Sequence, residues 1–136
     1  MLMEVGYFCD KVESDLASLV DELAEITNRS STNEILSWQR SLPKLSIALS
    51  QPKLQDYHIS LGQSGNISLE YKLPAASAWC DAVLLGNGDT QPSAVMIELK
   101  DWDTRGTKAT TREGLVEQRG IISSHPSDQV RGYTEY

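Results

Sequence analysis

Cysteines are scarce in this sequence, and long apolar segments are absent from it. Its two cysteines, Cys9 and Cys80, are too few for a disulfide scaffold and do not have the spacing of metal ligands. No apolar run approaches the ~20 residues that a membrane-spanning helix needs. The N-terminus also lacks the charged and then apolar layout of a signal peptide. These absences disfavour a secreted or membrane-spanning protein and predict a cytoplasmic one. The length of 136 residues predicts one domain with a single hydrophobic core.

Basic residues are also in short supply, since 12 Lys and Arg residues accompany 19 Asp and Glu residues. The formal net charge of -7 argues against a nucleic-acid partner at first. However, residues 1–35 hold eight acids and two bases, whereas residues 36–136 hold eleven acids and ten bases. The second part is therefore nearly neutral. It would not bind DNA tightly by charge alone, so we expect another domain or subunit to provide most of the DNA-binding affinity.

Apolar residues repeat at helical spacing in two N-terminal segments. Residues 11–27 carry a stripe that predicts an amphipathic helix, either packed on the domain or binding a partner; the stripe consists of Val12, Leu16, Leu19, Val20, Leu23 and Ile26. A second helix is predicted from Thr32 to Leu49, where Ser31 and Glu34 fit a capping box. Pro43 inside this helix should kink or split it, because its ring removes one backbone hydrogen bond.

Three later segments have the pattern of β-strands. Residues 66–73 alternate between apolar and polar side chains, which predicts a half-buried strand. Residues 79–85 and 93–100 are apolar on both faces, as expected for inner strands of a sheet covered by helices on each side. In the polar stretch that follows, residues 115–122 are interpreted as a hairpin arm. This arm either contacts a phosphate backbone or is simply solvated.

Charged residues occur at the ends of the two inner strands. Asp81 opens the first of them, and Glu98-Leu99-Lys100 closes the second. Because side chains alternate along a strand, Glu98 and Lys100 share a face, and a turn at residues 86–89 would bring Asp81 beside them. Two carboxylates and an ammonium at one end of a sheet are suited to holding a divalent cation and a phosphodiester.

A last helix is predicted to start at Pro126, which suits the first helical position. Gln129 and Tyr133 are four residues apart and so lie on one face of this helix, as site residues or as a packing pair. His125, just before the helix, is interpreted as a capping or hydrogen-bonding residue rather than a ligand.

The ordered set of Asp81, Glu98-Leu99-Lys100, Gln129 and Tyr133 resembles the PD-(D/E)XK nuclease superfamily, in particular its RecB-like branch. Longer stretches are similar to the nuclease domain at the N-terminus of prokaryotic nuclease–helicase fusion proteins: Glu70–Pro74, Asp81–Gly86, Ala94–Trp102 and His125–Gln129. The resemblance covers residues 31–136. Cys80 departs from it, because the family often has proline there, but this position carries no chemistry.

The resemblance implies an α/β fold with a restriction-endonuclease-like core, a central mixed β-sheet flanked by helices. Residues 1–30 would form an acidic amphipathic helix region and residues 31–136 the nuclease-like core. The sequence ends in its last helix, so the last core strand is missing by this comparison. The expectation is a C-terminally incomplete core, from a fragment or a shortened version of a longer protein.

The implied activity is Mg²⁺- or Mn²⁺-dependent hydrolysis of DNA, within a larger nuclease–helicase protein that acts in DNA processing or in defence against foreign DNA. Asp81, Glu98 and the Leu99 backbone carbonyl would bind the metal ion. Lys100 would orient the attacking water, and Gln129 and Tyr133 would steady Lys100 and the substrate strand. Two further acids are candidates for the metal site by resemblance, although each has an ordinary structural interpretation as a capping residue or a strand charge: Glu34 and Glu70.

Two alternatives to a DNA nuclease stay open. A nuclease fold without activity would serve as a scaffold that docks DNA or protein, which the missing strand and the acidic balance favour. The complete set of Asp81, Glu98, Lys100 and Gln129 opposes that interpretation. An RNA nuclease is compatible with the same residues.

Overall fold

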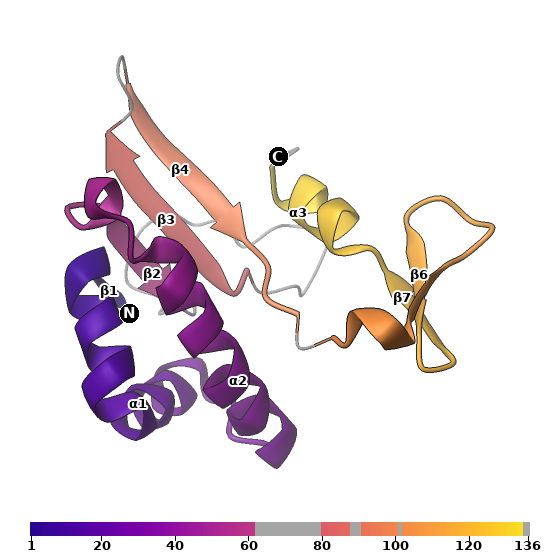
Figure 1. The fold of residues 1–136 in the computed structure, drawn as a ribbon, viewed down its shortest axis with the longest axis horizontal. Coiled ribbons are helices and arrows are strands. Elements are labelled where there is room, and N and C mark those ends of the chain that lie inside the picture. The colour runs from indigo at the N-terminus through magenta and orange to yellow at the C-terminus, as the bar shows by residue number, and fades with distance from the viewer. Residues whose placement is uncertain (62–79, 88–90, 101, 135–136) are drawn as a thin grey trace.

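The computed structural model describes residues 1–61, 80–87, 91–100 and 102–134. The described part of the chain is mixed α/β, with two antiparallel sheets and three α-helices (Figure 1). None of the helices in these ranges is long and apolar enough to span a membrane.

The larger sheet has four strands in the order β1-β2-β3-β4. All its pairings are antiparallel, so a mixed sheet is not seen among the described strands, which are β1 (Leu2–Glu4), β2 (His58–Leu61), β3 (Ala82–Asn87) and β4 (Pro92–Ile97). Strands β3 and β4 confirm that both predicted segments form strands. Among the described strands β3 is an inner strand, whereas β4 is the last in the order and has β3 as its neighbour. The predicted strand at residues 66–73, with Glu70, lies outside the described residues.

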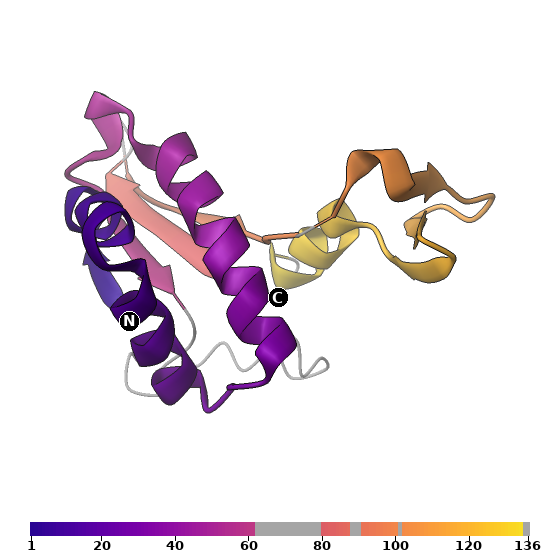
Figure 2. The same ribbon diagram turned by 60° about the horizontal axis from the view of Figure 1, so that its bottom comes forward.

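Two long helices, α1 (Val5–Thr27) and α2 (Thr32–Leu49), lie on the same face of this sheet (Figures 1 and 2). The core fills the space between them, and its largest fully buried side chains come from both helices and from β2: Phe8, Leu19, Leu42, Ile59 and Leu61. Residues Pro92–Val95 of β4 are exposed. The prediction that both inner strands are buried on both faces is therefore wrong for this half of β4.

The helix boundaries follow local chemistry. The Ser31 hydroxyl accepts a hydrogen bond from the Glu34 N–H at 3.3 Å and donates one to Glu34 Oε2 at 2.7 Å, which confirms the capping box at the start of α2. Pro43 does not split α2, which continues to Leu49. The break in helical geometry lies instead in α1, at Asp15, where φ is -154° and ψ is 58°.

The smaller sheet projects away from the body of the molecule (Figures 1 and 2). Its three strands are antiparallel: β5 (Thr107–Ala109), β6 (Leu115–Gln118) and β7 (Ile121–Ser124). Strands β6 and β7 confirm the predicted hairpin arm, to which β5 adds a strand that sequence patterning missed. Helix α3 (Pro126–Thr134) begins at Pro126 as predicted, and His125 Nδ1 accepts a hydrogen bond from the Ser127 N–H at 3.1 Å. That bond confirms the hydrogen-bonding interpretation of His125.

Candidate active site

The antiparallel pairing of β3 with β4 brings the predicted charged residues to one end of the larger sheet. Ala82 pairs with Ile97, so Asp81, just before β3, and Glu98, just after β4, lie at the same end. This is the end of the sheet nearest α3 (Figure 1). The predicted strand at residues 93–100 is three residues too long, because β4 ends at Ile97. Glu98, Leu99 and Lys100 therefore follow the strand rather than lie within it.

Asp81 is tied to the other strand end by a backbone hydrogen bond. Its Oδ2 accepts from the Leu99 N–H at 2.8 Å. Burial raises the pKa of the Asp81 carboxyl above its ordinary value, and the Glu98 carboxylate adds to this rise. The Leu99 hydrogen bond and the positive charges of Lys100 and Arg29 act in the opposite direction. The net rise means that the ionised form of Asp81 lacks full compensation here.

Glu98 and Lys100 contact each other directly. Lys100 Nζ donates to Glu98 Oε1 at 2.6 Å, and the exposed fractions of the lysine and glutamate side chains are 25% and 7%. A carboxylate as buried as Glu98 requires a charged or hydrogen-bonding partner, because unpaired buried charge is costly. Lys100 Nζ also lies 5.8 Å from the centre of the Trp102 ring. The predicted closeness of Glu98 and Lys100 is confirmed.

The donor set at this end of the sheet fits a hard divalent cation. Asp81 and Glu98 supply carboxylate oxygens, the ligand type that Mg²⁺ and Mn²⁺ prefer. Their mutual repulsion contributes to the raised pKa of Asp81, and a cation between them would remove that repulsion. Among the described residues no group of three or more His, Cys, Asp or Glu side chains is placed to bind a metal. A cation bound by Asp81 and Glu98 would take its remaining oxygen ligands from other groups, such as the backbone, water or substrate.

Helix α3 lies beside the end of β4 (Figure 1). On it, Gln129 Oε1 is buried and has no hydrogen-bond partner among the described residues. The expectation that Gln129 steadies Lys100 and the substrate strand stays a prediction. A buried acceptor without a partner is costly, by about 1–3 kcal/mol, and such atoms are often satisfied by a ligand or water. Tyr133 lies in α3, but its side chain is outside the described part of the chain.

Glu34 has the capping role that the sequence left open. Besides its hydrogen bonds with Ser31, its Oε1 forms an ion pair with Arg29 Nε. The Ser31 hydrogen bond and the Arg29 charge hold the pKa of Glu34 below its ordinary value. Both carboxylate oxygens are thus engaged, Oε1 by Arg29 and Oε2 by Ser31. The other additional acid, Glu70, lies outside the described residues.

Arg29 is the residue near the site that sequence reasoning missed. It follows α1 and precedes the capping box, and its positive charge acts on the Asp81 carboxylate. The available signal was a lone arginine two residues before the N-cap Ser31. That signal is weak, because nothing in the sequence reveals that the α1–α2 connection lies near the end of β3.

Comparison of the chain with protein-family models, curated proteins and solved structures gives no match.

Proposed function

We propose that the chain is a metal-dependent nuclease that hydrolyses DNA phosphodiester bonds, with a restriction-endonuclease-like core of the PD-(D/E)XK, RecB-like type. The observation that carries this proposal is the cluster of Asp81, Glu98 and Lys100 at one end of the β3–β4 pair. Two partly buried carboxylates beside an ammonium are costly to maintain for stability alone. They are well suited to a cation and a phosphate.

Each residue of the cluster has a distinct role in the proposed reaction. Asp81 and Glu98 hold Mg²⁺ or Mn²⁺, with the Leu99 carbonyl as a further ligand. The bound cation supplies charge neutralisation at the phosphate and lowers the pKa of water. The Leu99 N–H fixes the orientation of the Asp81 carboxylate through its 2.8 Å hydrogen bond. Lys100 orients the attacking water and offsets negative charge that develops on the phosphate.

Helix α3 supplies positioning groups. The buried Oε1 of Gln129 has an unused acceptor site that an N–H or O–H group of substrate, water or Lys100 can fill when substrate binds. Tyr133 is one helical turn further along α3 and contributes to holding the substrate strand. These groups act by placement, so their removal costs less than removal of Lys100.

The partners of the proposed nuclease are DNA and a helicase domain or subunit. Because residues 36–136 hold eleven acids and ten bases, long-range attraction for DNA is weak. A helicase adds affinity for DNA and separates its strands. The complex acts in DNA processing or in defence against foreign DNA. A cytoplasmic location follows from this proposal.

The proposal is tested by a cleavage assay with the chain on labelled single- and double-stranded DNA and RNA. We expect cleavage of DNA with Mg²⁺ or Mn²⁺, none with EDTA, and none after Asp81→Asn or Glu98→Gln. Glu117→Gln, on strand β6 of the projecting arm, is the matched control and keeps activity. Cleavage that survives Asp81→Asn contradicts the proposal, and cleavage of RNA alone changes the substrate class.

The second candidate is a nuclease fold without activity that docks DNA or protein. One observation favours it: Lys100 Nζ is bonded to Glu98 Oε1, an arrangement that stabilises the loop after β4 without any cation. Absence of cleavage with either metal on all four substrates, together with binding of DNA, selects this candidate.

A further inference from the structure

Glu98, Lys100 and Trp102 are spaced two residues apart in the segment that follows β4. Lys100 Nζ donates to Glu98 Oε1 at 2.6 Å, and it also lies over the indole ring of Trp102, 5.8 Å from the ring centre. A cation within about 6 Å of the centre of an aromatic ring is attracted by the negative charge density of the ring face. The ammonium therefore has two separate contacts, one with a carboxylate and one with a neutral ring.

Trp102 does not belong to the main hydrophobic core of the described residues. The side chains of Ile97 and Leu99 pack against that core, whereas Trp102 is not among the described side chains that do so. Trp102 is nevertheless partly buried. A tryptophan in the core is explained by the large apolar area that it buries. For Trp102, the contact that the structure describes for its ring is with the Lys100 ammonium.

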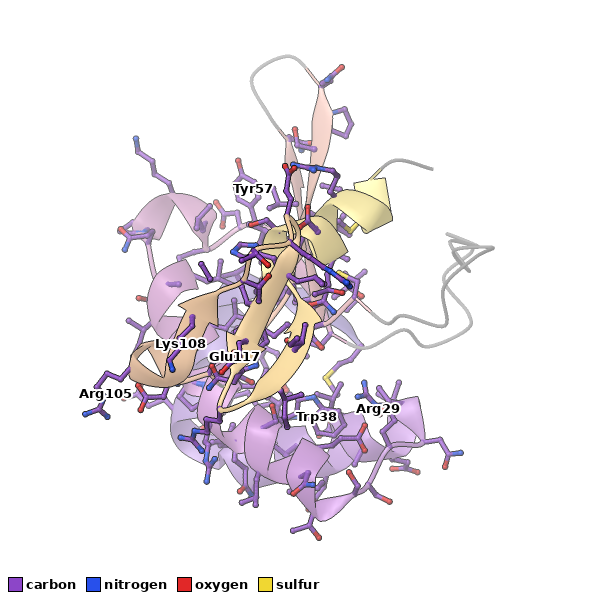
Figure 3. All side chains as sticks on the ribbon, turned by 90° about the vertical axis from the view of Figure 1, so that its right-hand side faces the viewer. Arg29, Trp38, Tyr57, Arg105, Lys108 and Glu117 are labelled. Carbon is purple, nitrogen blue, oxygen red and sulfur yellow. The ribbon has the colours of Figure 1, made fainter. Side chains whose placement is uncertain are left out.

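A cation also lies over a tryptophan at Arg29, but there the ring has another role. The guanidinium carbon of Arg29 lies 5.8 Å from the centre of the Trp38 ring, and Figure 3 shows these two side chains next to each other. Trp38 is a core residue, with 9% of its surface exposed. Packing explains the Trp38 ring without the cation, whereas the ring of Trp102 lies outside that core.

The two contacts of Lys100 differ in how they respond to a metal ion at the cluster. A divalent cation bound to the Glu98 carboxylate is attracted to the same negative charge as the ammonium, and it repels the ammonium as a like charge. Metal binding therefore weakens the ion pair between Lys100 and Glu98. Mg²⁺ and Mn²⁺ take oxygen ligands, so they do not compete for the Trp102 ring. The ring contact remains when the ion pair weakens.

We propose that Trp102 is a positioning residue, whose ring keeps the Lys100 ammonium at the cluster when Glu98 binds the metal ion. This inference rests on the proposed nuclease function, in which Lys100 orients the attacking water. It also accounts for the Lys100–Glu98 ion pair as the metal-free arrangement of an active site. Loss of the ring should leave metal binding intact and slow the cleavage of bound DNA, because the ammonium is then free to leave the cluster.

NMR spectroscopy of the full chain with ¹³C-labelled lysine tests the ring contact without any cleavage assay. The Lys100 signals are identified by their absence in Lys100→Ala. Because the ammonium lies over the ring, the protons on the adjacent Lys100 carbon should be shifted upfield in the wild type and lose this shift in Trp102→Leu. The upfield shift should persist after saturation with Mg²⁺ and in metal-free Glu98→Gln, where the charged partner is gone. Loss of the shift in either case contradicts the proposal.

Cleavage kinetics test the consequence for catalysis. We expect Trp102→Leu to lower kcat about tenfold with KM nearly unchanged, the effect of losing one partly desolvated contact between a cation and a ring. Trp102→Phe keeps an aromatic face and should retain most of the rate. In the Lys100→Ala background, Trp102→Leu should cause no further loss, since the ring acts through Lys100. Trp38→Phe, at the ring beneath Arg29, is the control for lost stability and should keep kcat at temperatures where it is folded.

The outcomes separate this inference from the function that it depends on. A raised KM with unchanged kcat in Trp102→Leu refutes the positioning role and makes Trp102 a DNA-binding residue, while the nuclease proposal stands. An equal loss of rate in the wild-type and Lys100→Ala backgrounds also refutes it. If the wild type binds Mg²⁺ but cleaves no nucleic acid, the nuclease proposal fails, and the Lys100 signals still show whether Trp102 holds the ammonium. Failure to bind Mg²⁺ at all refutes both.

Discussion

At the scale of single residues, the Asp81 carboxyl group experiences opposing influences. Burial and the Glu98 charge raise its pKa, whereas the Leu99 hydrogen bond and the charges of Lys100 and Arg29 lower it. Burial has the largest effect, so the pKa is raised on balance. Without a cation, Asp81 is therefore a source of instability in the folded protein at neutral pH. A residue kept at such a cost is expected to have a functional role.

The pH dependence of stability tests this description of Asp81. A carboxyl group with a raised pKa binds more protons in the folded than in the unfolded state, so the free energy of unfolding falls as pH rises from 3.8 through the raised value. In the Asp81→Asn variant, the amide oxygen can still accept the Leu99 hydrogen bond, but the side chain does not titrate. In metal-free buffer at pH 7, this variant should be more stable than wild type, with the difference shrinking toward pH 4. Urea unfolding at several pH values measures it, and a less stable variant at pH 7 contradicts it.

At the scale of secondary-structure elements, the packing of Tyr57 on β3 requires glycine at position 86. A Cβ added at Gly86 would overlap the ring of Tyr57, whose hydroxyl donates to the Asn87 carbonyl at 3.2 Å. Tyr57 precedes β2, so this contact helps to set the packing of β2 on β3. The position of Asp81 at the other end of β3 depends on the same strand.

Substitution of Gly86 tests this contact. Gly86→Ala should lower the free energy of unfolding by about 1–3 kcal/mol, because the ring or the strand must shift to make room. Gly132→Ala is the control, since nothing lies within 4 Å of its added Cβ in α3 and alanine favours helix more than glycine does. Denaturant unfolding of the two variants gives the comparison. Equal stability of Gly86→Ala and wild type would show that Tyr57 moves aside without cost.

Helices and strands could be predicted where local patterns dominate. Ser31 and Glu34 predict the start of α2, and Pro126 predicts the start of α3, because capping chemistry acts within one helical turn. Pro43 does not split α2, since packing of buried neighbours such as Leu42 and Leu45 outweighs one lost hydrogen bond. Short β1 and β5 were missed, because three residues carry no measurable period.

In the candidate site, too, the residues placed by local structure could be predicted and those placed by tertiary structure could not. Asp81, Glu98 and Lys100 were predictable because strand pairing across one turn is a local matter. The Arg29 contribution was not, because it depends on the tertiary fold, which brings the charge of a residue 52 positions earlier in the chain to act on Asp81. Likewise, no local pattern indicates whether the Glu34 carboxylate is engaged by Arg29 or free to bind a metal.

At the scale of the whole molecule, metal binding couples the site to the stability of the entire chain. A ligand that binds only the folded state raises the free energy of unfolding by about 2.7 kcal/mol at 100 times its Kd. We expect Mn²⁺ to raise the unfolding temperature of the chain, and Asp81→Asn to abolish this rise. Thermal unfolding with and without Mn²⁺ measures both, and Glu117→Gln serves as a control with the same charge change. An unchanged Mn²⁺ effect in Asp81→Asn would place the metal elsewhere.

Substitution of Lys100 should lower the rate of catalysis by the whole molecule but leave its metal binding intact. The Lys100 ammonium donates a hydrogen bond to Glu98 Oε1. Because it is itself a cation, it is not a ligand of the metal ion. Its loss should affect the water and the developing charge, whereas Asp81 and Glu98 remain to bind the metal. Gln129→Ala should cost less, because Gln129 acts by placement.

The most direct measurement is the rate of DNA cleavage by Lys100→Ala beside its Mn²⁺ affinity, with Lys53→Ala, an exposed lysine, as the control. We predict that Lys100→Ala keeps the Mn²⁺ affinity within a few-fold and loses ~10²–10³ in rate, by analogy with loss of one positioned oxyanion donor. Lys53→Ala should keep both. Full cleavage activity in Lys100→Ala would contradict the proposed role of Asp81, Glu98 and Lys100 as a catalytic cluster.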